Sequence, residues 1–319
     1  MEFAKIVFDA FDKLLNKSQN EVVEIDGEED VSILTDCKYS KTQKYEAVLD
    51  AYYINKGKRA MPVVVYLHGG GFVSGGKEYR TAIAKWLAVQ GYFVINVNYG
   101  LCHECVFPEQ FKHLSMAIKW LETNKEKYNL NLKKVVVAGD SAGAYYASML
   151  ACLSTSKKLQ EKLDTEINIK FAGVILNCGL YDLQSVLERR LAFDLNGKIF
   201  ESYTGIKKDE ADNYKYKEFC SPLNLVNKLF PPTFLIYSEK DIFCAGQAEK
   251  LIEKFEEKDI YFESFCSVSP FVNHCFSLEW KSKQAQRANF LQSRFLDKIK
   301  KGSVCKKLSQ AKNRVCEKM

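Results

Sequence analysis

The chain of 319 residues lacks several features that define other classes of protein. No stretch approaches the 18 apolar residues of a membrane-spanning helix, so no transmembrane helix is expected. Residues Met1 to Lys5 lack the basic region, apolar core and cleavage site of a secretory signal. We therefore expect a cytoplasmic protein whose eleven cysteines are reduced thiols, and their odd number agrees with this.

The chain has a formal net charge of +6, but the residues before its C-terminal tail carry no excess of basic side chains. Residues 298–319 hold eight Lys or Arg and one Glu, a charge of +7, which leaves −1 on the rest. A nucleic-acid partner is therefore not expected. Val304, Leu308, Ala311 and Val315 have helical spacing, so this C-terminal tail could form a helix that contacts a membrane surface or a partner. A solvated or frayed end is the interpretation we favour.

Strand-like apolar runs alternate with helical patterns along most of the chain. This alternation predicts an α/β fold with a mostly parallel sheet and helices on both faces. The length and the 47% hydrophobic content favour one large domain over residues 1–319. The predicted strands are Ala47–Tyr53, Val63–Leu67, Phe93–Val97, Val135–Ala138, Ala172–Asn177, Thr233–Tyr237 and Tyr261–Cys266.

The sequence Gly139-Asp140-Ser141-Ala142-Gly143 stands between an apolar run and a helical stretch from Ala144 to Leu153. A G-x-S-x-G turn between a strand and a helix exposes a serine as a nucleophile. The glycines leave room where such a turn brings chain segments close together. The motif predicts Ser141 as a catalytic nucleophile, whereas an ordinary helix cap is the structural alternative.

A second motif, His68-Gly69-Gly70-Gly71-Phe72, directly follows an early predicted strand. Such a segment supplies backbone N–H groups to an oxyanion hole. Two of the three glycine N–H groups, together with that of Ala142, could point at one oxygen. We favour Gly70 and Gly71, and Gly69 stays open. A glycine-rich turn alone would explain either motif but not the pair.

The remaining catalytic residues follow from chain order, which runs nucleophile, acid, histidine in this type of fold. Only His274 of the four histidines comes after Ser141, so it is the predicted base. Asp241 ends the apolar run before it and is the predicted acid, and Glu239 is a weaker rival. These residues predict hydrolysis through an acyl-enzyme, in which His274 moves the proton of Ser141 and Asp241 orients the imidazole.

These motifs together resemble the hormone-sensitive-lipase-like carboxylesterases and acetyl esterases, a branch of the α/β-hydrolases. The resemblance spans about residues 45 to 295 and also rests on Ser221-Pro222-Leu223 and on Val97-Asn98-Tyr99-Gly100-Leu101 before Phe107-Pro108. It implies that residues 1–19, which have an amphipathic helical pattern, and residues 182–219 form a small cap over the site. The chain departs from the family pattern at Gly100, where an arginine is usual.

We expect the substrate to be a small ester with a short, acetyl-like acyl chain. The resemblance implies this, because many members of that family prefer such esters, and Phe72, Tyr145, Tyr146 and Tyr181 are expected to crowd the pocket. Deacetylation of a carbohydrate and hydrolysis of an aryl formamide need the same triad and stay open. A non-catalytic binding protein on this scaffold is the alternative of another class. The sequence does not reveal the oligomeric state, and a homodimer is left open.

No cofactor and no metal are expected. Cys102-His103-Glu104-Cys105 has the spacing of half a zinc site, but a second ligand pair at fixed spacing is missing.

Overall fold

A nine-stranded sheet organises the part of the chain that the computed structural model describes: residues 5–10, 12–14, 25–42, 44–55, 57, 59–188, 194–305, 307, 309 and 316–318. The strand order is β1-β2-β4-β3-β5-β6-β7-β8-β9. β2 pairs antiparallel with β1 and β4, and every other pair is parallel. The predicted mostly parallel sheet is therefore confirmed. The strands are β1 (Ser32–Lys38), β2 (Val48–Tyr53), β3 (Met61–Leu67), β4 (Phe93–Val97), β5 (Leu130–Asp140), β6 (Gly173–Asn177), β7 (Thr233–Ser238), β8 (Phe262–Ser267) and β9 (Cys316–Lys318).

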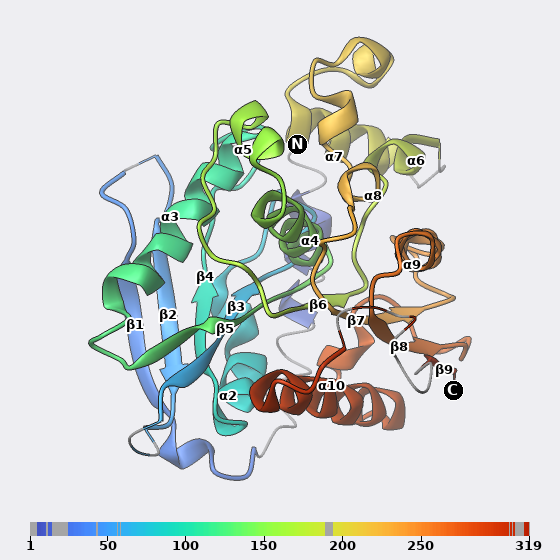
Figure 1. Cartoon of the computed structure of the whole chain (residues 1–319). Helices are drawn as coiled ribbons and strands as arrows, with labels where there is room; N and C mark the ends of the chain where they lie inside the picture. Colours follow the sequence, from blue (N-terminus) through green and yellow to red (C-terminus); the bar gives the residue numbers. More distant parts are fainter. Residues whose placement is uncertain are drawn as a thin grey trace.

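Helices cover both faces of this sheet, as the sequence pattern predicts (Figure 1). Alternate residues of β3 point to opposite faces, as the pleat of a strand requires. Val63 and Val65 join one hydrophobic core with α3, α4 and α9, and Val64 and Tyr66 join another with α2 and α10. The bounds are α2 (Thr81–Val89), α3 (Glu109–Asn124), α4 (Ala142–Ser154), α5 (Lys157–Lys162), α9 (Gln247–Glu257) and α10 (Lys283–Lys301).

The two edge strands were not among the predicted strands. β1 is largely exposed and its register shifts between Leu34 and Cys37, so it lacks the apolar run that marks the inner strands. β9 has three residues and pairs with β8 in the basic tail. Of the four residues on which a possible helix in this tail rested, Val304 lies outside any helix, and residues 308, 311 and 315 lie outside the described residues.

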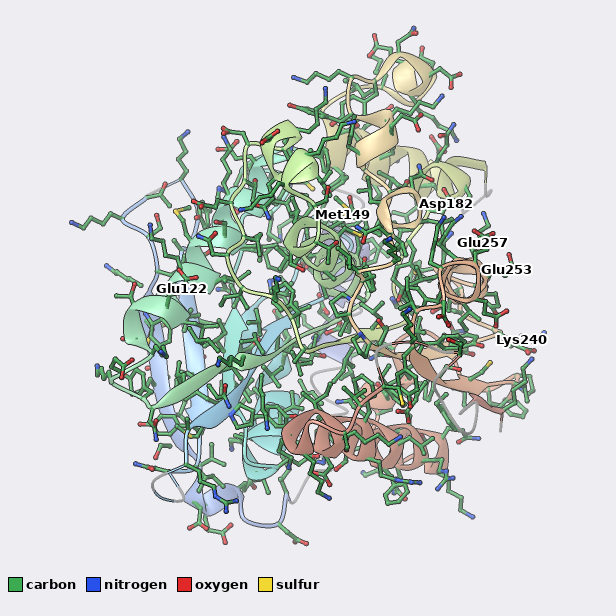
Figure 2. The ribbon with its side chains drawn as sticks, viewed as in Figure 1. Glu122, Met149, Asp182, Lys240, Glu253 and Glu257 are labelled. Carbon is green, nitrogen blue, oxygen red and sulfur yellow. The ribbon has the colours of Figure 1, made fainter. Side chains whose placement is uncertain are left out.

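Short helices lie at the carboxyl ends of the parallel strands, at the top of Figure 1. They are α6 (Leu183–Glu188), α7 (Leu195–Thr204), the 3-10 turns η4 (Lys208–Asn213) and η5 (Lys217–Phe219), and α8 (Pro222–Leu225). Asp182, labelled in Figure 2, anchors their start by accepting a hydrogen bond from Lys250 of α9 at 2.8 Å. Residues 5–10 and 12–14 are also helical, as predicted, and the rest of 1–19 lies outside the described residues.

The remaining short helices connect the strands: η1 (Glu28–Asp30), η2 (Lys77–Arg80) and η6 (Phe276–Leu278). None of the described helices combines the length and the apolar composition that a membrane crossing needs.

Candidate active site

Ser141 occupies a sharp turn between the end of β5 and the start of α4. Its backbone has φ 53° and ψ −118°, a conformation that non-glycine residues rarely adopt and that is often found where a site stores strain. The Ser141 N–H donates to the carbonyl of Asn177 at the end of β6, at 2.8 Å. A Cβ atom at Gly143 would lie 2.0 Å from the Leu67 carbonyl oxygen. Only glycine therefore allows α4 to approach β3 this closely.

The structure brings His274 and Asp241 to Ser141 from two different loops. His274 Nε2 lies 2.8 Å from Ser141 Oγ. On the other side of the ring, Nδ1 lies 2.9 and 2.8 Å from the two Asp241 carboxylate oxygens. Both side chains are buried. The three positions thus form one hydrogen-bonded chain, as acyl transfer by a serine requires.

Asp241 is held as an anion in this buried place. Burial would raise the pKa of its carboxyl group, but His274 and the N–H groups of Phe243 and Cys244 outweigh burial and lower that pKa below its usual value. Glu239, the rival acid, instead pairs with Lys318 at 3.0 Å. Lys240, between the two acids, is exposed and is labelled in Figure 2. The structure therefore brings Asp241, and not Glu239, to the imidazole.

Asn273 joins the loops of Asp241 and His274, a role that the sequence reasoning missed. Its Oδ1 accepts the N–H of Ile242 at 3.0 Å and the N–H of His274 at 2.8 Å. The only signal in the sequence is its place directly before the histidine.

The glycine segment after β3 lies against the turn of Ser141. Gly69 donates its N–H to the carboxylate of Asp140 at 3.1 Å, so this group is already used. The N–H groups of Gly70, Gly71 and Ala142 have no hydrogen-bond partner among the described residues. Gly70 has φ 121°, and a Cβ there would lie 2.0 Å from the Ser74 carbonyl oxygen. Of the predicted donors, the structure therefore favours Gly70, Gly71 and Ala142 over Gly69.

His68 begins this segment and is buried as a neutral ring. Burial lowers its pKa to about 4. Its Nδ1 donates to the carbonyl of Gly69 at 2.7 Å, and its ring stacks on Tyr99 with centroids 4.3 Å apart. The Tyr99 hydroxyl donates to the His68 carbonyl at 2.6 Å. These contacts support the glycine segment and leave His68 away from the proton-transfer chain.

A buried arginine beneath the site was also missed. Arg80 is 1% exposed and donates through Nε and Nη2 to the two carboxylate oxygens of Asp140, at 2.8 and 2.7 Å. Nη2 also donates to Asp12 at 2.9 Å. The motif leaves the residue before the serine unspecified, so it gave no reason to seek a partner for Asp140.

The four predicted pocket residues are all buried aromatic side chains. Phe72 meets Tyr145 and Tyr146 edge-on, with centroids 5.2 and 5.6 Å apart. Tyr145 donates to the carbonyl of Cys220 at 2.8 Å, which links α4 to the segment before α8. Tyr181 is 1% exposed. Their contact with a substrate stays a prediction.

Side chains of types that can bind a metal ion lie around His274 in the described part of the chain. Cys178 and Cys275 form one such group with His274, and Asp241 and Cys244 form a second group with the same histidine. Their ligand atoms lie within 4.8 Å of one another in each group, but the imidazole is already engaged by Ser141 and Asp241.

The segment Cys102 to Cys105, which has the spacing of half a zinc site, belongs to neither of these groups. Cys105 Sγ lies 3.9 Å from His113 Nδ1, and His103 is exposed. A Cβ at Gly100 would lie 2.4 Å from the His113 ring, so a larger residue at this position would require His113 to move.

Comparisons with known proteins agree with this geometry. The family model named BD-FAE matches residues 49–255. An acetyl esterase of Salmonella schwarzengrund is 30% identical over 184 residues, which are 56% of this chain and 55% of that enzyme, so the match spans about half of this curated relative. Esterase B of Lactobacillus rhamnosis is 24% identical, with a TM-score of 0.81 and coverage of 94% of this chain and 96% of that chain. An esterase of Pyrobaculum calidifontis is 22% identical, with a TM-score of 0.67 and coverage of 95% and 94%.

Proposed function

Because the chain belongs to the BD-FAE family, we propose that it is a serine esterase that hydrolyses short-chain acyl esters through an acyl-enzyme. The family match and the fold confirm the resemblance to hormone-sensitive-lipase-like carboxylesterases. One observation carries the proposal: the continuous chain of hydrogen bonds from Ser141 through His274 to Asp241.

In the first half of the reaction, Ser141 Oγ attacks the ester carbonyl carbon while His274 Nε2 accepts its proton. The imidazolium that forms is stabilised by Asp241, which also holds the tautomer with the free electron pair on Nε2. When the tetrahedral intermediate collapses, the ester C–O bond breaks and His274 returns the proton to the leaving alcohol. The product of this half is the acyl-enzyme on Ser141.

In the second half, water takes the place of the alcohol. His274 removes a proton from the water, the oxygen attacks the acyl carbon, and the same proton returns to Ser141 Oγ as the acid leaves. In both halves, the negative charge on the carbonyl oxygen would be met by the N–H groups of Gly70, Gly71 and Ala142. Loss of one such donor costs about 100- to 1000-fold in rate in well-studied enzymes.

A short acyl chain is supported by the crowding of aromatic side chains beside the turn. Phe72, Tyr145 and Tyr146 fill the space between the glycine segment, α4 and α7, where Tyr203 donates to the Tyr145 hydroxyl at 2.9 Å. The Salmonella relative is named an acetyl esterase, and one Lactobacillus esterase B structure is described as inhibited with a tributyrin phosphonate. Activity on a series of p-nitrophenyl esters with acyl chains from C2 to C12 tests the preferred chain length. Maximal activity on the C12 ester would contradict the proposal.

Two experiments test the catalytic step itself. Ser141→Ala should abolish turnover of p-nitrophenyl acetate, and a fluorophosphonate probe should label the unaltered protein but not this variant. Unchanged turnover in Ser141→Ala would refute the assignment. Absence of both labelling and turnover in the unaltered protein would favour a binding protein instead.

The proposal also assigns roles to the cap, the pocket residues and the basic tail. Residues 182–219 and the N-terminal helix would form the cap, Phe72, Tyr145, Tyr146 and Tyr181 would line the pocket, and residues 298–319 would form a basic tail outside the catalytic body. The substrate would be a small ester, with no cofactor and no nucleic acid. Cell fractionation tests the cytoplasmic location, and light scattering tests whether the protein forms a homodimer.

A further inference from the structure

We propose that Arg80 is a positioning residue for the oxyanion hole and that the N-terminal helix acts on the oxyanion hole through Arg80. The inference rests on the proposed esterase function. Arg80 and Asp12 do not touch the reacting atoms. They would instead fix the positions of the N–H groups of Gly70 and Gly71.

The first step is the link between the two catalytic segments. Asp140 stands directly before Ser141, and its Oδ2 accepts the N–H of Gly69, directly before the predicted oxyanion donors. One carboxylate thus ties the turn of Ser141 to the glycine segment. Because hydrogen bonds to a charged acceptor are about twice as strong as neutral ones, the charge on Asp140 matters for this link.

The second step is what pairs that charge. Asp140 is fully buried, and burying a charged side chain is costly unless it is paired and hydrogen-bonded. Arg80 binds both of its oxygens in a fork, and the Tyr66 hydroxyl donates a third hydrogen bond at 3.0 Å. Lysine carries the same charge but cannot form the fork. Loss of the fork would therefore loosen the hold of Asp140 on Gly69.

The third step connects the N-terminal helix. Asp12, 1% exposed, accepts from Arg80 Nη2 at 2.9 Å, the same nitrogen that binds Asp140. One turn earlier, the ring of Phe8 lies against Gly71, where an added Cβ would be 2.3 Å from it. Asp9 accepts a hydrogen bond from Ser74, two residues after that segment. Two contacts therefore hold this helix against the glycine segment and the residues that follow it, and a third joins it to Arg80.

The alternative is that the helix only shields the site or shapes the substrate pocket. In that case its loss would raise KM and leave kcat unchanged, because the donors for the transition state would keep their places. Misplaced donors instead lower kcat, since they act on charge that appears only in the transition state.

The experiment compares Arg80→Lys, Arg80→Gln and Asp12→Ala with the unaltered full-length protein on p-nitrophenyl acetate. We expect kcat to fall by about 10- to 100-fold in Arg80→Gln, below the cost of losing a whole oxyanion donor. Arg80→Lys should recover part of this loss, Asp12→Ala should lose several-fold, and KM should stay within twofold in all three. Affinity for a trifluoromethyl ketone, which forms a tetrahedral adduct on the serine, should fall in parallel with kcat.

Lys77→Ala is the matched control, because Lys77 lies on the same 3-10 turn and pairs with Asp36 and Asp50 instead. It should keep kcat. If Arg80→Gln does not fold, Arg80→Lys and Asp12→Ala, checked by near-ultraviolet circular dichroism, decide the question. Folded variants with unchanged kcat, or with a change in KM alone, would overturn the inference. If the unaltered protein has no turnover that depends on Ser141, the proposed function fails instead.

Discussion

Two buried histidines beside the turn of Ser141 differ in their partners, and the partners decide their tasks. His68 donates to the Gly69 carbonyl and has no hydrogen-bonded carboxylate among the residues that the structure describes, and burial lowers its pKa to about 4, so it stays neutral. His274 holds Asp241 on one nitrogen and Ser141 on the other. The residue type is the same, but only the second ring is arranged to gain a proton and to return it.

The oxyanion side of the site, around the glycine segment, and the base side, around His274, also differ in the contacts that hold them. On the oxyanion side, two buried ion pairs join Arg80 to Asp12 and to Asp140. On the base side, two neutral hydrogen bonds to Asn273 join the loop of Asp241 to the loop of His274. Changes on the base side should therefore act on proton transfer, and changes on the oxyanion side should act on charge stabilisation.

The largest effect should come from neutralising the partner of His274. Asp241→Asn should lower kcat by about 10,000-fold, because an amide favours the wrong imidazole tautomer and does not stabilise its cation. The measurement is kcat on p-nitrophenyl acetate. Glu239→Gln is the control on the same loop and should keep its activity. A similar loss in both variants would contradict the assignment of the acid.

A smaller loss is expected on the oxyanion side. Gly70→Ala should lower kcat by about 100- to 1000-fold, because the added Cβ would meet the Ser74 carbonyl and move the N–H donors. Gly91→Ala is the matched control, since Gly91 also has a positive φ of 86° but open space around it. Retained kcat in a folded Gly70→Ala protein would show that this segment does not hold the oxyanion.

The neutrality of His68 should appear as a pH dependence of stability. Between about pH 6.5 and pH 4 the unfolded chain binds a proton on this histidine that the folded chain does not. The free energy of unfolding should therefore fall by up to about 1.4 kcal/mol per pH unit as the pH decreases through this window. Urea denaturation at several pH values measures it.

Two variants isolate the contribution of His68. His68→Asn keeps a donor for the Gly69 carbonyl and should remove this part of the slope, whereas His103→Gln, at an exposed position, should not change it. Equal slopes in the unaltered protein and in His68→Asn would mean that His68 is not the group responsible.

The smallest effect is expected from the bridge between the two loops of the base side. Asn273→Ala removes the acceptor of two backbone N–H groups and should lower kcat by about 10-fold, the equivalent of one or two ordinary hydrogen bonds. Asn227→Ala, which removes a comparable side-chain bridge to Thr155 away from the site, is the control. Unchanged kcat in Asn273→Ala would mean that packing alone holds the two loops together.

Much of the fold could be predicted because the inner strands are buried on both faces. Val63–Leu67 and Thr233–Tyr237 are continuous apolar runs, and the structure has β3 and β7 at these places. The exposed β1 carries no such run, and β9 has only three residues in a charged tail. Their pairing depends on sheet edges supplied by β2 and β8, which a local pattern does not describe.

By itself, the sequence determined the order of the chemical groups. It determined a serine in a turn that needs glycine, one histidine after it, and glycines early in the chain, because these are constraints on residue type and chain order. The tertiary structure decided between Asp241 and Glu239, engaged Gly69 with Asp140, and buried Arg80 against Asp12 and Asp140. These choices depend on distances between segments far apart in the chain, and a charged side chain such as Arg80 needs partners of opposite charge because folding removes the water around it.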